Sequence, residues 1–280
     1  MYNTLRPELI TATPAQRKLM KSDPTYVVEI SMFKQNPLTY FEVHRLFILG
    51  AQEKRWKATI AHRFAEILHR KMGKLTRVFT QNIDGLYSQC DGIPSEKIVN
   101  VYGTLSKTGC EGCGAEVANF DEFCDEMKSS IKDIYNVDME APSKSSPIKC
   151  ESCRKPMVKP LTILFGSNYS SEFFERSSED LPRLDLLILA GTSLVMSPVN
   201  NIVPSVPDTY LQMILNPNTV GQDLGIDYGA EANRDYFAEG NCDEVFWELC
   251  DHLGWIDNLK EFADVLLLYL LVYSFHSWNL

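Results

Sequence analysis

Apolar residues follow two different spacings along the chain, and these spacings predict helices early in the sequence and strands later. Residues 40–72 show helical spacing and predict two consecutive helices. The second is marked by apolar side chains at i, i+4, i+7 and i+8, which are Ile60, Phe64, Ile67 and Leu68. The first 70 or so residues are therefore expected to be mostly helical.

Short apolar runs replace the helical spacing after residue 74. The runs that predict strands are 75–80, 98–103, 161–165, 184–190 and 210–215. Residues 184–190 are almost continuously apolar, which is typical of a parallel strand buried on both faces. Several runs end in Gly, Ser, Thr or Asn. This arrangement predicts an open parallel α/β sheet whose ligands bind at the carboxyl ends of the strands.

Two C-x-x-C pairs interrupt this pattern, with an amphipathic segment at 120–134 between them. The pairs are Cys110/Cys113 and Cys150/Cys153. Four thiolates at this spacing suit one tetrahedral zinc ion, and a shell of four cysteines leaves no position open for water, so the metal would be structural. The alternative is that unrelated cysteines fall in pairs by chance.

Net charge and the N-terminus narrow the possible partners. The formal charge is −10 and the pI is about 5.1, which excludes a basic surface for direct nucleic-acid binding. An acidic surface suits basic partners such as lysine-rich tails. The first residues show no secretory signal, so we expect an intracellular protein of the nucleus or cytoplasm.

Polar residues follow two of the predicted strands. Residues 80–86 read TQNIDGL, and residues 191–193 read GTS. Amides, a carboxylate and hydroxyls can bind a nicotinamide, a ribose or a phosphate. Taken alone, the stretch at 80–86 is better explained as an ordinary Asx-type turn, and the stretch at 191–193 is a weak signal.

The order of these motifs resembles the sirtuin family between residues 2 and 255. Residues 101–103 stand where sirtuins carry a His-Gly, and the cysteine pairs follow. The remaining matches, in order, are Lys159-Pro160, Phe165-Gly166, LILAGTSL at 187–194, Asn216, and GNCD at 240–243, which is near the family's usual GDCD.

The resemblance implies an NAD-dependent protein-lysine deacetylase or deacylase that transfers the acyl group to ADP-ribose. It implies a Rossmann-like NAD-binding domain at 1–109 and 154–256 and a zinc module at 110–153. An apolar tail at 257–280 follows these domains. Acylated lysine in proteins, including histone tails, would be the substrate, and residues 163–166 would pair with that peptide as a strand.

The resemblance also implies the site residues. The cofactor-binding residues would be Gln81, Asn82, Asp84, Gly191, Thr192, Ser193, Asn216 and Cys242. Asn82 and Tyr102 would occupy the catalytic positions, Ile163, Leu164, Phe165 and Gly166 the substrate positions, and Cys110, Cys113, Cys150 and Cys153 the zinc positions.

The chain departs from the family at its start and at residue 102. No GAGxS-type turn or DFR segment precedes Tyr2, so the chain resembles an N-terminally truncated sirtuin whose sheet lacks the first strand. Tyr102 stands at the catalytic histidine. A phenol titrates near 10 and an imidazole near 6.5, so only about 0.1–0.3% of a tyrosine is ionised at neutral pH. We therefore expect impaired activity.

Three interpretations stay open. The chain is an incomplete copy of an active deacylase, an inactive sirtuin-fold module that binds acyl-lysine peptides or protein partners, or a degenerate chain. The apolar run at 262–275 lies beyond the resemblance. It is shorter than a membrane span, so a packed tail is favoured over membrane contact, and it could cover a sheet edge.

Overall fold

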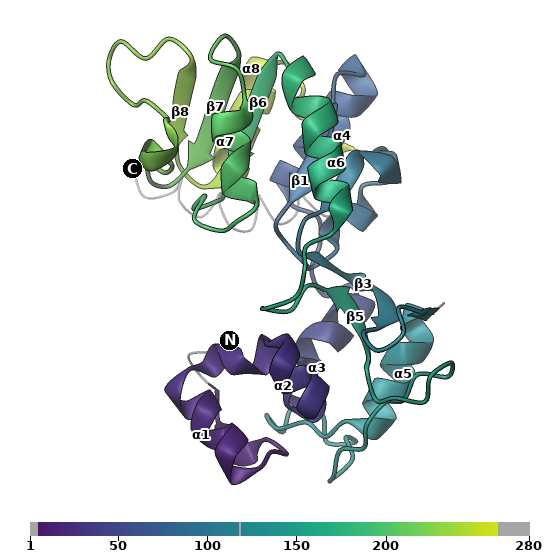
Figure 1. The fold of residues 1–280 in the computed structure, drawn as a ribbon. Coiled ribbons are helices and arrows are strands. Elements are labelled where there is room, and N and C mark those ends of the chain that lie inside the picture. Colours follow the sequence, from purple (N-terminus) through teal and green to yellow (C-terminus); the bar gives the residue numbers. More distant parts are fainter. Residues whose placement is uncertain (1–4, 118, 263–280) are drawn as a thin grey trace, which may run out of the picture. The chain divides into compact units, whose positions relative to one another are not determined.

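The computed structural model describes residues 5–117 and 119–262, and within them the chain forms two compact units. The cysteine unit comprises residues 5–56, 82–85 and 102–169. The sheet unit comprises residues 57–81, 86–101 and 170–262. Each unit is described by itself (Figure 1).

The cysteine unit combines helices with a small antiparallel sheet of order β4-β3-β5. Its helices are α1 (Pro14–Ser22), α2 (Ile30–Gln35), α3 (Leu38–Gln52) and α5 (Phe120–Ser130), and its strands are β3 (Gly103–Cys110), β4 (Glu116–Val117) and β5 (Val158–Thr162). Helix α3 is buried along most of its length. Its Phe41 and Ile48 belong to one core cluster with Met127 of α5 and Leu105 of β3.

The strand predicted at 161–165 is placed differently in the structure. It spans 158–162 and runs antiparallel to β3, so it does not join a parallel sheet. The reason lies in the cysteine pairs. Strand β3 ends at the first pair and β5 follows the second, and two pairs that meet at one point bring these strands side by side in opposite directions.

The sheet unit contains two separate parallel ladders, β1-β2 and β6-β7-β8. Its strands are β1 (Val78–Thr80), β2 (Ile98–Asn100), β6 (Leu186–Ala190), β7 (Leu211–Asn216) and β8 (Asp235–Glu239), and its helices are α4 (Ile60–Met72), α6 (Ser171–Asp180), α7 (Ile202–Ser205), α8 (Cys242–His252) and α9 (Ile256–Lys260). The predicted α/β class with parallel strands is confirmed.

Alternating side chains of the β6-β7-β8 ladder pack on opposite faces, as the period of two in a strand requires. Leu187 and Leu189 of β6 pack with Val203 of α7. Ile188 faces the other way, toward a cluster that includes Phe246 of α8. Helices therefore cover both faces of this ladder (Figure 1).

Helix α4 contacts both parallel ladders. Ile60, Phe64 and Ile67 pack in the cluster beneath β6-β7-β8, whereas Ala65 packs in a second cluster with Val78 of β1. Helices account for most of residues 14–72, and no strand lies between residues 5 and 72, so the prediction of a helical start is confirmed.

No helix among the described residues is long and apolar enough to cross a bilayer. The apolar tail singled out in the sequence lies, after Phe262, outside the described residues.

Candidate functional site

The four paired cysteines come together in the cysteine unit. Their sulfur atoms all lie within 4.8 Å of one another, with 3.6 Å between Cys110 and Cys153 and 3.8 Å between Cys113 and Cys150. A tetrahedral zinc site with Zn–S bonds of about 2.3 Å has sulfur atoms about 3.8 Å apart, whereas a disulfide requires about 2.05 Å. The group can therefore hold one metal ion, and zinc fits its donor set.

Two backbone turns of the same form position these sulfurs. In each turn the amide of the first cysteine, Cys110 or Cys150, donates to the carbonyl five residues later at 2.9 Å. The residue four positions later donates back to that cysteine's carbonyl at 2.8 Å and has a positive φ, +71° at Gly114 and +59° at Arg154. The two C-x-x-C segments thus form matching knuckles.

Burial and backbone amides act on the thiols in opposite directions. Burial raises the pKa of Cys110 to about 12. The backbone N–H of Cys153 stabilises the thiolate of Cys150 and lowers its pKa to about 6. Gly112 also donates its N–H to the Cys110 sulfur at 3.3 Å. The residues predicted from the sequence did not include Gly112, although a glycine inside a C-x-x-C segment is a recognisable signal for such a contact.

The sheet unit brings several of the predicted cofactor residues to the carboxyl ends of its strands. Thr192, after β6, donates its hydroxyl to the side-chain oxygen of Gln81, after β1, at 2.6 Å. Gly191 has φ +60°, and a Cβ there would lie 3.1 Å from the sulfur of Cys242. A glycine therefore permits the tight turn at the edge where ligands of parallel sheets bind.

Asn216 and Ser193 belong to the same edge. Asn216 ends β7, and its side-chain amide donates to the carbonyl of Asn218 at 2.8 Å. Ser193 is exposed directly after Thr192. Hydroxyl and amide groups at this edge can donate and accept the hydrogen bonds that a dinucleotide requires.

The other predicted residues lie in the cysteine unit. Asn82 and Asp84 belong to a loop that is joined to β3, where the amide of Leu105 donates to the carbonyl of Ile83 at 2.8 Å. Tyr102 directly precedes β3, and its ring centroid is 6.0 Å from that of Tyr169.

Gly103 fixes the backbone beside Tyr102. Its φ is +81°, and a Cβ at this position would lie 1.9 Å from the carbonyl oxygen of Leu161. Only glycine fits here without a backbone shift. The Tyr102-Gly103 turn is thus set by close contact with β5, whatever side chain stands at residue 102.

Residues 163–166 continue from β5 and already make backbone bonds. Ile163 donates to the carbonyl of Tyr102 at 2.8 Å, and Phe165 donates to Val28 at 2.9 Å and accepts from Ile30 at 3.0 Å. The backbone of Phe165 is therefore engaged in this structure, while its side chain is 48% exposed. Pairing of this segment with a peptide stays a prediction.

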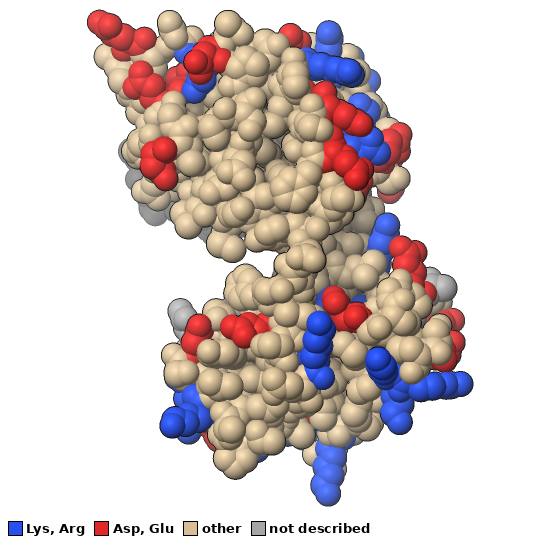
Figure 2. Space-filling view, in the orientation of Figure 1, with Lys and Arg blue, Asp and Glu red and all other residues tan. Residues whose placement is uncertain are grey.

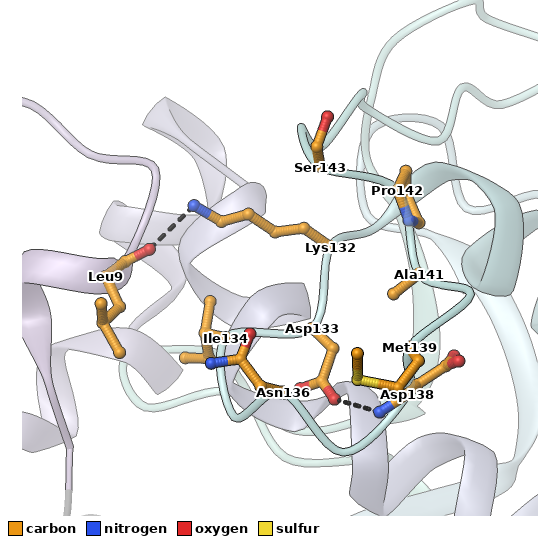
Figure 3. A pocket seen from close by; sticks show the side chains of 10 residues that line it. All are labelled: Leu9, Lys132, Asp133, Ile134, Asn136, Asp138, Met139, Ala141, Pro142 and Ser143. Carbon is orange, nitrogen blue, oxygen red and sulfur yellow. Dashed lines mark hydrogen bonds between the residues drawn. The ribbon is translucent and has the colours of Figure 1, made fainter.

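A pocket of about 320 Å³ opens elsewhere in the cysteine unit (Figure 3). Its floor is the turn held by Asp133, whose carboxylate accepts from the amides of Val137 and Asp138 at 2.7 and 2.8 Å. Lys132 donates to the carbonyl of Leu9 at its rim, at 2.8 Å. None of the predicted site residues lines it.

Comparison with known proteins relates the sequence of this chain to one family. The model of the Sir2 family matches residues 14–198. The chain is 30% identical over 251 residues to the NAD-dependent protein deacetylase sirtuin-2 of Danio rerio, covering 85% of this chain and 60% of that protein. It is 28% identical over 239 residues to the NAD-dependent protein deacetylase hst2 of Schizosaccharomyces pombe, covering 85% of this chain and 63% of that protein. The chain thus spans less than two thirds of these relatives.

Proposed function

Because the chain belongs to the Sir2 family, we propose that it binds NAD and acts on acylated lysine in proteins, with a structural zinc ion in its cysteine unit. The activity proposed is transfer of the acyl group from lysine to ADP-ribose. The observation that carries the proposal is the convergence of Gln81, Gly191, Thr192 and Cys242 at the carboxyl ends of parallel strands. Relatives described as NAD-dependent protein deacetylases support it.

Different residues of the chain would bind different portions of NAD. Gly191, Thr192, Ser193, Asn216 and Cys242 would hold the adenosine and phosphate portion, because they lie at the strand ends of the sheet unit. Gln81, Asn82 and Asp84 would hold the nicotinamide and its ribose. NAD, when bound, supplies the ADP-ribose that accepts the acyl group.

The identity of residue 102 determines how fast we expect the chain to turn over substrate. The resemblance places a general base at this position, and loss of a general base typically costs about 10²- to 10⁴-fold. A phenol with a reference pKa near 10 is almost fully protonated at neutral pH. We therefore propose that the chain turns over far more slowly than an enzyme with histidine there.

A second function is favoured by the backbone at Tyr102. The Tyr102-Gly103 turn keeps its tight backbone without a histidine, so the unit could retain peptide binding after losing turnover. In that case the protein would be a binding module for acyl-lysine peptides or for protein partners.

Nicotinamide release from NAD in the presence of an acetyl-lysine peptide tests the proposal. We expect turnover of the unmodified chain well below about 1 per second, which is the lower end of the usual range for enzymes. Tyr102→His should raise turnover, because an imidazole titrates near neutral pH and a phenol does not. Tyr102→Phe is the matched control and should stay within about twofold of the unmodified chain if the phenol does not act as a base.

Binding measured alongside turnover separates the two functions. Saturable binding of an acetyl-lysine peptide, without nicotinamide release by any variant, would support the binding module. Turnover near or above about 1 per second by the unmodified chain would show that Tyr102, or another group, serves as an efficient base.

A further inference from the structure

Lys159, on strand β5 of the cysteine unit, is buried although it carries a charge. Lysine and arginine side chains project into solvent on the visible face of this unit (Figure 2), which is their usual position. The side chain of Lys159, in contrast, is only 1% exposed. A buried ammonium is costly unless it is paired and hydrogen-bonded, so the contacts of Lys159 must offset that cost.

The charge of Lys159 is balanced by a residue of the first cysteine knuckle, residues 110–113. Its Nζ lies 2.9 Å from a carboxylate oxygen of Glu111. The amide of Glu111 also donates to the carbonyl of Met157, two residues before Lys159, at 2.9 Å. The ion pair therefore joins the first knuckle to β5 through a side chain, in addition to the backbone.

The same ammonium bonds the backbone at the other end of β5. Nζ of Lys159 donates to the carbonyl of Thr162 at 2.5 Å and to that of Pro160 at 3.0 Å. The pairing of β3 with β5 shifts register over this stretch, between Gly103 and Thr108. Such an irregularity disrupts the regular ladder locally, and the ammonium supplies hydrogen bonds to carbonyls beside it.

The backbone that Lys159 contacts is also the backbone that fixes the turn at residue 102. Gly103 pairs with Thr162. The amide of the next residue, Ile163, donates to the carbonyl of Tyr102 at 2.8 Å. One buried side chain thus contacts both the knuckle that carries two of the clustered cysteines and the strand residue opposite Gly103.

We propose that Lys159 is a positioning residue that couples the metal site to the Tyr102-Gly103 turn. Its ammonium links the carboxylate of Glu111 to the carbonyl of Thr162, so a displacement of the first knuckle is transmitted to the turn. Metal bound by the four cysteines would hold that knuckle in place and, through Lys159, the backbone of residue 102. Only the consequence for catalysis rests on the proposed function, since the coupling itself does not require turnover.

Site-resolved amide hydrogen exchange of the zinc-loaded protein tests the coupling. Lys159→Met keeps a long apolar side chain but removes the ammonium, so the amide of Ile163 should exchange faster by about tenfold or more. Zinc content should stay at about one ion per chain, because all four cysteines remain. Amides in the middle of α5, which report the general stability of the same unit, should change by less than about twofold.

Lys132→Met is the matched control within the cysteine unit. The Lys132 ammonium also bonds a backbone carbonyl, that of Leu9 at 2.8 Å, and lies 3.6 Å from the carboxylate of the buried Glu42. These partners belong neither to a knuckle nor to β5. The control variant should therefore not speed exchange at Ile163 more than it does in α5.

Glu111→Ala breaks the same link from its other end and decides the matter if Lys159→Met does not fold. It should also speed exchange at Ile163 while zinc is retained. The double variant Lys159→Met, Glu111→Ala should exchange no faster at Ile163 than the faster single variant, because the link is already broken. Effects that multiply in the double variant would show that the two residues act independently and would overturn the proposal.

Three further outcomes would overturn the proposal. These are an unchanged Ile163 amide in a folded, zinc-loaded single variant, equal acceleration in α5, and a lack of zinc in the unmodified protein. Failure of the proposed function looks different. In that case no variant releases nicotinamide from NAD, while the selective acceleration at Ile163 is still observed.

Discussion

A single buried titratable side chain can make the stability of the folded protein depend on pH, and His44 is the clearest case. It lies within α3, its ring stacks on Tyr40 with centroids 4.4 Å apart, and its Nδ1 donates to the Tyr40 carbonyl at 2.7 Å. Burial lowers the pKa of His44 to about 4, although the hydrogen bond to Tyr40 opposes this shift. The folded protein therefore keeps this ring neutral at a pH where an unfolded chain would protonate it.

We predict that His44 destabilises the protein as the pH falls from about 6.5 to about 4. In that window the unfolded state binds a proton that the folded state does not, so the free energy of unfolding decreases with decreasing pH. A separation of about 2.5 units between the two pKa values corresponds to a loss of about 3 kcal/mol. Denaturant unfolding measured across this pH range checks the prediction.

A matched pair of variants isolates the effect of burial. His44→Asn retains a side-chain N–H donor and should flatten the slope between pH 6.5 and 4. His252 bonds the carbonyl four residues before it, as His44 does, but it is exposed. His252→Asn should therefore leave the profile as it is. Equal slopes in the His44→Asn variant and the unmodified chain would contradict the prediction.

At the scale of elements, the two cysteine knuckles and the paired strands β3 and β5 form one structural unit. The knuckles repeat the same backbone hydrogen bonds, and the strands that carry them pair in opposite directions. This pairing also places the Tyr102-Gly103 turn against Leu161. The metal site and the turn at the proposed catalytic position are thus connected through the same two strands.

We predict that the protein binds about one zinc ion through Cys110, Cys113, Cys150 and Cys153. The double variant Cys110→Ser, Cys150→Ser should lose it, because two of four thiolate ligands disappear. Zinc content should also fall as the pH is lowered, because protons compete with the metal for the thiolates. Metal analysis of the purified protein measures both effects.

Cys124→Ala provides the control, because Cys124 is buried in the same unit but is not one of the four clustered cysteines. It should retain the full zinc content even if it lowers stability. Zinc that remains in the double serine variant, or its absence from the unmodified protein, would show that the four sulfurs do not form the site.

At the scale of the whole molecule, each apolar cluster of the described residues lies within one unit. The clusters around Phe41 and around Ile10 draw only on the cysteine unit. The clusters around Phe64, Ile214 and Ala65 draw only on the sheet unit. Burial of apolar surface is the main stabilising contribution within each, so each unit has the core that an independent folding unit requires.

We predict that removing the metal destabilises the cysteine unit and leaves the stability of the sheet unit nearly unchanged. A chelator should speed amide exchange in β3, β5 and α5, because a structural zinc ion contributes directly to folding free energy. Exchange in β7, at the centre of its ladder, should change by less than about twofold if the two units open separately. Hydrogen exchange followed by mass spectrometry can compare these segments.

The same experiment on the double variant Cys110→Ser, Cys150→Ser gives the control. It should show fast exchange in the cysteine unit without chelator and no further response when chelator is added. Equal loss of protection in β7 and β3 would show instead that the two units unfold as one cooperative body.

Periodicity and local motifs in the sequence determined many of the elements and the four cysteines that cluster. Apolar spacing identified α4 because its apolar face packs against the cores, and it also identified α3, which is buried along most of its length. The run at 184–190 identified β6 because side chains of β6 contact apolar residues on both faces. The C-x-x-C spacing identified the four cysteines that cluster, because each pair forms its turn locally. The order of motifs also indicated the family.

Long-range pairing was decided only by the tertiary structure. The strand near residue 161 became antiparallel because it pairs with β3, some 50 residues earlier, and strand direction is not encoded in a short apolar run. The Thr192–Gln81 bond and the contact between Gly103 and Leu161 likewise join residues far apart in sequence. Nor could the spacing show that β6 would end the ladder of described strands, because a strand's neighbours depend on which other segments reach it and not on its own side chains.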